Sequence, residues 1–294
     1  MPRTIRPRRS ALYMPGSNAR ALEKAKDIPA DCLIFDLEDA VAPDAKDEAR
    51  AQVCAAIKAG GYGNREIVVR VNGLTSPWGR EDIVAASNSG AHGLLLPKVQ
   101  GAGYIREVLS IMDVADAPET TSIWCMMETP LAILHAERIA AASPRIGALV
   151  MGTSDLTKDL QAHHTRDRLP MVTSLGICML AARAFDIAIL DGVHLDLDDA
   201  EAFETICHQA HDMGFDGKTL IHPKQVEPAN RIFGPAEEEI EGARRIIEAH
   251  AEASKAGKGV VVVDGKLVEN LHVQEARRTL ALAEAIGKFG GSAA

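Results

Sequence analysis

Two carboxylates stand where apolar segments of the chain come to an end. Glu128 directly follows the run Ile-Trp-Cys-Met-Met, and Asp155 ends a second apolar run 27 residues further on. A charge at the end of a buried strand usually marks a site, because an isolated charge is costly in a core. Two carboxylates from neighbouring strands, with no histidine or cysteine beside them, form the all-oxygen site that suits Mg²⁺. This pair predicts an enzyme.

Other apolar segments also deliver polar side chains at their carboxyl ends. Because alternate side chains of a strand point to opposite faces, Asp36 and Glu38 share one face of their strand. Each polar position has a structural alternative: the carboxylates could cap helices, the arginine could be an ion-pair partner of Glu38 or Glu128, and the lysine could be solvated. The positions are Asp36, Glu38 and Asp39 after the second run, Arg70 in the third and Lys98 at the end of the fourth.

The elements that would position these residues alternate between short β-type runs and helical stretches. The eight runs are 10–15, 32–39, 66–73, 93–99, 123–129, 148–155, 188–193 and 218–223, and helical stretches include 18–27, 45–59, 131–142 and 200–213. Strand and helix alternating at this spacing indicate βαβ units with a parallel sheet. Eight repeats favour a closed (β/α)₈ barrel of the TIM type.

The last part of the chain departs from this repeat. From about residue 234 it shows a helical stretch over 235–256, a short apolar run at 260–264, a turn and a final helix. We therefore expect a barrel over 1–233 and a C-terminal extension over 234–294.

Composition excludes several classes of protein. The formal charge of −9 argues against a nucleic-acid surface, and no apolar run approaches the ~18 residues that span a bilayer. The five cysteines are scattered and lack a C-x-x-C pair, and no apolar segment follows the arginines of residues 1–10. These features predict a cytoplasmic protein without a secretory signal.

Several other motifs are incomplete. Gly217-Lys218-Thr219 lacks the earlier glycine of a phosphate-binding loop. The pairs His208/His211 and His163/His164 each lack a third metal ligand.

At the polar strand ends the chain resembles the HpcH/HpaI aldolase and citrate lyase β-subunit family, in its CoA-ester lyase branch. The resemblance runs nearly from end to end. The segments that carry it are Ser10-Ala-Leu-Tyr-Met-Pro-Gly-Ser17, Phe35-Asp-Leu-Glu-Asp-Ala-Val41, Arg70-Val-Asn-Gly73, Leu96-Pro-Lys98, Met127-Glu-Thr129, 152–156 and 214–223.

The resemblance implies a TIM-type barrel that binds Mg²⁺, with Mn²⁺ as a substitute, through Glu128 and Asp155. It implies that Arg70 contacts the substrate, that Asp36, Glu38 and Asp39 hold metal-bound waters, and that CoA lies across the barrel mouth. Such proteins cleave or form 3-hydroxyacyl-CoA esters such as malyl-, methylmalyl- or citramalyl-CoA, with glyoxylate or pyruvate as the oxo acid. The family is typically homotrimeric or homohexameric, and the C-terminal segment caps a neighbouring subunit's site.

The residues can be assigned roles in this chemistry. Arg70 offers the fixed positive charge that a thioester enolate needs. Glu38 is predicted to be a second catalytic residue beside it. For the substrate and its CoA phosphates we expect contacts from Tyr13, Pro15, Arg20, Lys24, Lys98 and the arginines of 3–9. The arginines of 3–9 have the alternative of a solvated tail.

The capping segment departs from the family pattern at one residue. In the malyl-CoA lyase branch an aspartate usually follows a Gly-Lys-hydrophobic-hydrophobic stretch, but here Glu269 follows Gly265-Lys266-Leu267-Val268. Glu269 is the predicted general acid/base, with its carboxylate about one methylene further out.

Three other functions fit the same layout. A thioesterase would hydrolyse a malyl-CoA-type ester instead of cleaving its C–C bond. A Schiff-base aldolase would use Lys98 or Lys218 and no metal. A non-catalytic, citrate lyase β-like subunit would work with an acyl-carrier partner.

Overall fold

The computed structural model describes residues 5–255, 257 and 259–290. The chain divides into two compact units. The barrel unit is Arg8–Asn230, and the C-terminal unit comprises Arg231–Ala294 together with Met1–Pro7.

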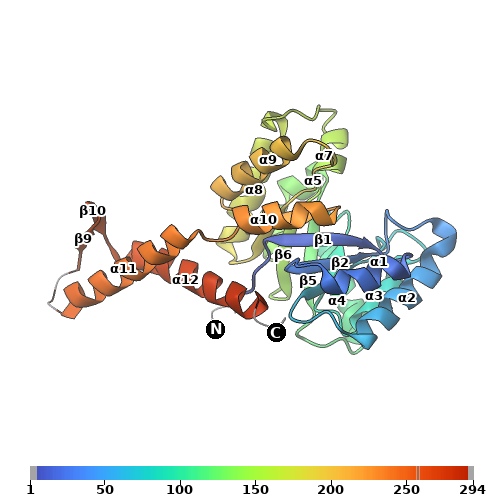
Figure 1. Ribbon diagram of the computed structural model, residues 1–294. Coiled ribbons are helices and arrows are strands. Elements are labelled where there is room, and N and C mark those ends of the chain that lie inside the picture. The colour runs from blue at the N-terminus through green and yellow to red at the C-terminus, as the bar shows by residue number, and fades with distance from the viewer. Residues whose placement is uncertain (1–4, 256, 258, 291–294) are drawn as a thin grey trace. The chain divides into compact units, whose positions relative to one another are not determined.

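The barrel unit is built on eight parallel strands that close on themselves. Each strand pairs with the next in chain order, and β8 pairs with β1, so the expected (β/α)₈ barrel of the TIM type is confirmed (Figure 1). The strands are β1 (Ser10–Pro15), β2 (Cys32–Asp36), β3 (Glu66–Arg70), β4 (Gly93–Leu96), β5 (Ser122–Met127), β6 (Ile146–Met151), β7 (Ala188–Asp191) and β8 (Gly217–Leu220).

Helices follow the strands around the outside of the barrel. They are α1 (Ala19–Lys24), α2 (Lys46–Ala59), α3 (Gly79–Ser87), α4 (Ala102–Val114), α5 (Pro130–Leu134), α6 (Ala136–Ala140), α7 (Thr153–Asp159), α8 (Leu169–Ala184), α9 (Ala200–Asp212) and α10 (Val226–Ile232), with 3₁₀ turns at Ala25–Asp27, Pro43–Ala45 and Pro223–Gln225. Side-chain caps start several of them; Thr129, for example, accepts the N–H of Ala132 ahead of a proline at the first helical position.

Seven of the eight predicted strands end two to four residues earlier in the structure, and the one predicted over 148–155 ends at Met151, just before α7. Three cases show the physical cause or a break in an element. The strand predicted over 32–39 ends at Asp36, because this carboxylate accepts the N–H groups of Glu38 and Ala40 and turns the chain. The strand predicted over 218–223 ends at Leu220, because the N–H groups of the next two residues bond to the Gln225 side chain. The helix predicted over 131–142 is two short helices that meet at His135.

The interior of the barrel is filled by apolar side chains around the fully buried Trp124. Below its indole, the guanidinium of Arg8 lies 5.0 Å from the ring and pairs with Glu66 at 2.7 Å. Both charged residues lie at the amino-terminal ends of the strands, so this pair closes the end of the barrel that is opposite the predicted site.

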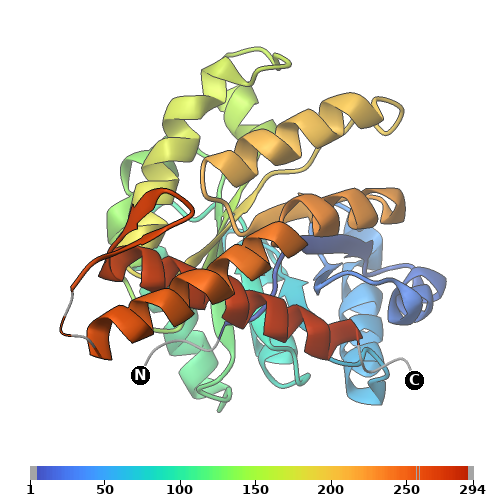
Figure 2. The ribbon, with the colours of Figure 1, turned by 60° about the vertical axis from the view of Figure 1, so that its left-hand side comes forward.

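The C-terminal unit contains a helical hairpin and a small antiparallel sheet. Helices α11 (Glu237–Lys255) and α12 (Asn270–Gly290) pack against each other (Figure 2), and the strands β9 (Val261–Val263) and β10 (Lys266–Val268) pair between them in sequence. In the described part of the chain, no helix combines the length and apolarity needed to cross a membrane.

The start of β8 leaves no room for a side chain at Gly217. A Cβ added there would lie 1.9 Å from the backbone oxygen of Arg8, so we expect Gly217→Ala to lower the free energy of unfolding by about 2–3 kcal/mol. The control is Gly103→Ala on the exposed start of α4, where a Cβ would meet only the tip of Arg106 at 3.9 Å. That change should raise stability by about 0.5–1 kcal/mol in urea titrations, since alanine is the better helix former. Equal effects of the two substitutions would contradict this packing.

Candidate active site at the carboxyl ends of the strands

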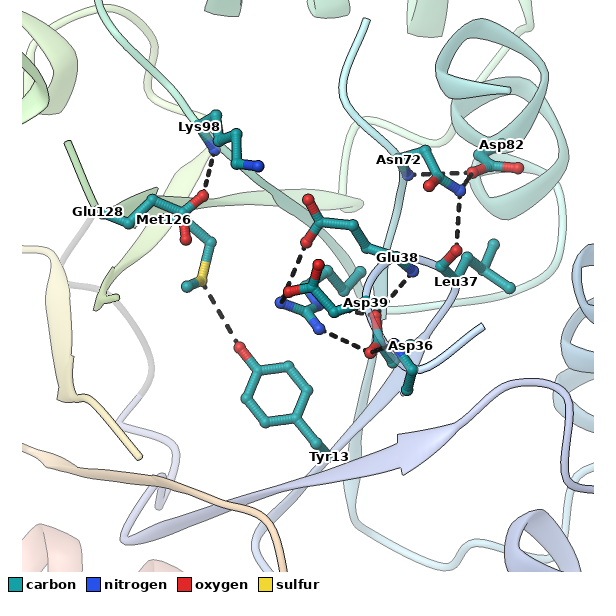
Figure 3. A network of polar contacts seen from close by, with 12 residues as sticks. Tyr13, Asp36, Leu37, Glu38, Asp39, Asn72, Asp82, Lys98, Met126 and Glu128 are labelled. Carbon is teal, nitrogen blue, oxygen red and sulfur yellow. Dashed lines mark hydrogen bonds and ion pairs between the residues drawn. The ribbon is translucent and has the colours of Figure 1, made fainter. Parts of the chain in front are cut away.

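Arg70 gathers three carboxylates at the mouth of the barrel (Figure 3). As the last residue of β3 it lies in register with Asp36, the last residue of β2. Its Nε and Nη2 donate to the two oxygens of Asp36 at 2.7 and 2.6 Å, in a bidentate pair. Its Nη1 lies 3.0 Å from Glu38 and 3.2 Å from Asp39. The structure therefore brings together four of the residues predicted for the site.

Burial and charge oppose each other in this cluster. Burial alone would lower the pKa of Arg70, but its hydrogen bond with Asp36 and the charges around it raise the pKa well above the usual value. Burial raises the pKa of Glu38 to about 7, although the guanidinium of Arg70 acts in the other direction. The arginine is thus a permanent cation, and Glu38 is a carboxyl that titrates near neutral pH.

The aromatic ring of Tyr13 packs against the guanidinium of Arg70. Its ring centroid lies 4.8 Å from the Arg70 guanidinium, and its hydroxyl donates to the sulfur of Met126 at 3.6 Å. Burial raises the pKa of the phenol, which keeps it neutral. A neutral aromatic face stabilises a neighbouring guanidinium.

The loop that carries Glu38 is held by a residue that the sequence did not single out. The buried Lys46 ammonium donates to the backbone oxygens of Leu37 and Glu38 at 2.8 and 2.7 Å and to Asn72 at 2.8 Å. Asn72 in turn donates to Leu37 and, at 2.6 Å, to the buried Asp82. A signal was present in the sequence: a lysine at the first position of a helix opposes the helix dipole and needs another reason to be there.

Glu128 lies directly after β5 in a place shaped by two backbone features. Its Oε1 accepts the N–H of Lys98 at 2.5 Å, and Lys98 adopts a left-handed conformation with φ of 50°. On its other side, a Cβ at Gly152 would lie 2.3 Å from the Glu128 Cβ and 2.8 Å from its Oε2. The glycine is needed for the carboxylate to occupy this position.

Asp155 completes the predicted pair from the first turn of α7. Burial raises the pKa of Glu128 to about 7, the Lys98 N–H opposes the shift, and the nearby charge of Asp155 adds to it. A divalent cation between the two carboxylates would relieve both the desolvation and the repulsion.

The pair of Glu128 and Asp155 is compatible with Mg²⁺. Among the residues that the structure describes, no group of three His, Cys, Asp or Glu side chains could hold a metal ion. Mg²⁺ binds through one or two carboxylates and keeps several waters, so a buried Glu128 beside a half-buried Asp155 suffices.

The residues predicted to contact the substrate or CoA, and the predicted general acid/base, lie on several different elements. Pro15 ends β1 and is half-buried, whereas Arg20 and Lys24 on α1 and the side chain of Lys98 are exposed. Glu269 is exposed after β10 in the C-terminal unit, where its N–H donates to His272 at 3.0 Å.

The arginines of 3–9 do not form the predicted CoA-phosphate site as a group. Arg3 lies outside the described residues. Arg8 and Arg9 pair with Glu66 and Asp31 at the amino-terminal ends of the strands, so the prediction is wrong for these two residues.

A second buried charge cluster lies at the ends of β7 and β8. The Lys218 ammonium is 2.6 Å from Asp191, and Arg168 contacts both oxygens of that carboxylate at 2.7 and 2.8 Å. Burial alone would raise the pKa of Asp191, but the two cations lower it. Lys218 is 1% exposed and serves as the counter-ion of this carboxylate, which argues against the Schiff-base alternative at this lysine.

This geometry can be compared with known proteins. The family model described as HpcH/HpaI aldolase/citrate lyase matches residues 9–223, which is most of the chain and all eight barrel strands. This chain belongs to that family. It is accordingly an enzyme of the HpcH/HpaI aldolase/citrate lyase type.

Relatives of two kinds cover almost the whole length of the chain. A (3S)-malyl-CoA thioesterase of Cereibacter sphaeroides is 50% identical over 286 residues, covering 97% of this chain and 98% of the relative. The citrate lyase subunit beta of Leuconostoc mesenteroides subsp. cremoris is 36% identical, covering 95% and 94%. CitE from Mycobacterium tuberculosis, solved in complex with magnesium, acetoacetate and coenzyme A, matches with a TM-score of 0.74 at 27% identity and covers 95% of this chain and 97% of that one.

The three carboxylates around Arg70 differ in exposure, which allows a matched test. Asp36→Asn removes the buried partner of the guanidinium, so we expect the free energy of unfolding to fall by about 3–5 kcal/mol. Asp39→Asn changes a side chain that is 70% exposed and should cost less than about 1 kcal/mol. Chemical denaturation of the two variants checks this, and similar losses for both would contradict the central place of Asp36.

Proposed function

We propose that this protein is a Mg²⁺-dependent CoA-ester lyase that cleaves or forms a 3-hydroxyacyl-CoA such as malyl-, methylmalyl- or citramalyl-CoA. The products of cleavage are an acyl-CoA and glyoxylate or pyruvate. The observation that carries the proposal is the Glu128–Asp155 pair beside the Arg70 cluster at the same end of the barrel. The proposal is also supported by a similar protein, CitE, whose structure was solved in complex with magnesium, acetoacetate and coenzyme A.

Glu128 and Asp155 would hold the Mg²⁺, with Mn²⁺ as a substitute. When bound, the metal supplies a Lewis acid for the oxygens of a 2-oxo acid. The N–H of Lys98 and the close approach of Gly152 keep Glu128 in one orientation. Asp39 and Glu38 would hold waters around this centre. Asp36 does not fit the water-holding role predicted for it, because its acceptor sites are used by Arg70 and by the N–H groups of Glu38 and Ala40.

Arg70 would bind the thioester oxygen at which enolate charge develops. Its Nε, Nη1 and Nη2 each donate one hydrogen bond to Asp36 or Asp39, and Nη1 also forms an ion pair with Glu38. In the described part of the chain, the second N–H of Nη2 has no partner. Because Asp36 and Tyr13 already fix the arginine, it needs no reorganisation when charge forms.

Proton transfer at the enolate carbon needs a carboxyl, and two are candidates. Glu269 of the C-terminal unit would reach the site of a neighbouring subunit in a homotrimer or homohexamer. Within the barrel unit, Glu38 has a pKa of about 7, so it can both accept and donate a proton near neutral pH. Tyr13, Pro15, Arg20 and Lys98 would contact the substrate or its CoA part.

Thioester hydrolysis is the second candidate function. It is favoured by the relative at 50% identity, which is named a (3S)-malyl-CoA thioesterase. The same site would then bind the same class of ester, but water would attack the thioester carbon and release free CoA. A citrate lyase β-like role with an acyl-carrier partner is supported by the relative at 36% identity.

Product analysis separates these functions. We expect the purified protein to convert malyl-CoA or citramalyl-CoA to acetyl-CoA plus glyoxylate or pyruvate with Mg²⁺, and to lose this activity in EDTA. Chromatography of the CoA species provides the readout. Free CoA with intact hydroxy acid would instead make the protein a thioesterase, and inactivity on both free esters would favour the carrier-dependent role.

The metal site can be tested without turnover. Gly152→Ala pushes the Glu128 side chain from its place, so we expect Mn²⁺ affinity, measured by electron paramagnetic resonance, to fall by about 10–100-fold. Gly103→Ala on α4 is the control and should bind Mn²⁺ as the unchanged protein does. Unchanged affinity in Gly152→Ala would argue against Glu128 as a ligand.

A mixing experiment tests whether the C-terminal unit acts on a neighbour. Glu269→Ala and Glu128→Gln should each lose activity by at least about 10²-fold. Mixed and re-assembled, the two variants should regain a fraction of it, because some sites then combine an intact barrel with an intact Glu269. If activity returns in no mixture while both variants assemble normally, the carboxyl acts within its own subunit or not at all.

A further inference from the structure

The hydroxyl of Tyr13 has a weaker hydrogen-bond partner than the hydroxyls of the other two tyrosines. Tyr62 donates to the backbone oxygen of Leu22 at 3.2 Å, and Tyr104 accepts a backbone N–H at 3.2 Å. In the described part of the chain, the Tyr13 hydroxyl bonds only to the sulfur of Met126, at 3.6 Å. A thioether is a poor acceptor, whereas a tyrosine packed against a core usually finds a good one.

The packing of the Tyr13 ring does not explain why an oxygen is present on it. The ring faces the guanidinium of Arg70, with its centroid 4.8 Å away, and it packs against the apolar interior of the barrel. A phenylalanine ring would make both contacts. Because Tyr13 is only half-buried, a stronger partner for its hydroxyl can come from whatever occupies the mouth of the barrel.

The Tyr13 hydroxyl lies between Arg70 and the carboxylates predicted to hold the metal. It points toward Met126, on the side where Glu128 lies (Figure 3). The methyl group of Met126 and Oε2 of Glu128 both lie beside Gly152, since a Cβ on this glycine would be 3.1 and 2.8 Å from them. Besides burial, the charge of Glu128 contributes to the raised pKa of the phenol. A substrate that reaches from Arg70 to the metal would therefore meet this hydroxyl.

The acid part of a substrate would occupy this position. In the proposed function Arg70 binds the thioester oxygen, while Glu128 and Asp155 hold the metal to which the 2-oxo acid binds. A neutral hydroxyl between them can donate to a carbonyl or carboxylate oxygen without repelling the metal. We propose that the Tyr13 hydroxyl donates a hydrogen bond to an oxygen of the 2-oxo-acid part of the substrate.

This role rests on the proposed function, because it concerns the same site. It applies to C–C cleavage and to hydrolysis alike, since both reactions use the same class of ester. The ring is already held by Arg70 and Met126, so the hydroxyl is oriented before a ligand arrives. Such a donor selects ligands that carry an oxygen at the matching place.

Tyr13→Phe tests this role, because it removes the hydroxyl and leaves the ring. We expect the affinity for glyoxylate or pyruvate with Mg²⁺, measured by isothermal titration calorimetry, to fall by about 10–100-fold, as for a lost hydrogen bond to a charged group. The affinity for free CoA should stay unchanged, because CoA lacks the acid part. The midpoint of urea unfolding should also stay unchanged, because only a contact with a thioether is lost.

Tyr62→Phe is the matched control. This tyrosine is 4% exposed, and its hydroxyl bonds to the backbone of helix α1. Its removal should lower the urea midpoint, because the Leu22 oxygen loses a partner, and should leave oxo-acid affinity unchanged. Unchanged oxo-acid affinity in Tyr13→Phe, or a loss of CoA affinity in its place, would overturn only the role of Tyr13. A parent protein that binds neither oxo acid would overturn the proposed function as well.

Fluorine NMR tests the same contact without removing the hydroxyl. In protein labelled with 3-fluorotyrosine, the Tyr13 resonance is assigned by its absence from Tyr13→Phe. We expect this resonance to shift when Mg²⁺ and the oxo acid are added, while the Tyr62 resonance stays in place. A Tyr13 resonance that does not move while calorimetry shows the oxo acid to bind would overturn the inference.

Discussion

The pair between Arg70 and Asp36 is the interaction on which the barrel mouth depends. Three carboxylates could not share this half-buried space without a cation, and the two residues are paired because their strands end in the same register. Asp36 has a second task, since it also turns the chain at the end of β2. One side chain therefore sets both the charge balance of the site and the path of the loop that carries Glu38 and Asp39.

Glu128 is also positioned by few groups, and these belong to the backbone. The carboxylate is oriented by the N–H of Lys98 and confined by Gly152, and no charged side chain among the described residues pairs with it. The charge of Asp155 adds to the rise in the pKa of Glu128 that burial causes. The mouth thus has one region where Arg70 offsets part of the carboxylate charge and another where backbone groups orient Glu128.

The fold and most of the site follow from the sequence, because apolar runs and their polar ends are local signals. Asp36, Glu38, Asp39 and Arg70 were predicted for one site, and the structure brings them together. The supporting residues were not predicted, because Lys46, Asp82 and Arg168 bind partners that only the closed barrel brings near. Strand ends were overestimated because the apolar pattern continues past the last ladder pair; after β8, for example, the side chain of Gln225 takes the place of the ladder partner.

Lys98 orients Glu128 through its backbone and not through its side chain. Its N–H orients the buried carboxylate while its side chain points to solvent, and its positive φ is well tolerated by glycine or asparagine. Residues of these types could replace the lysine and leave the geometry of Glu128 intact. The side chain at position 98 can therefore change in charge or size without disturbing the backbone group that orients Glu128.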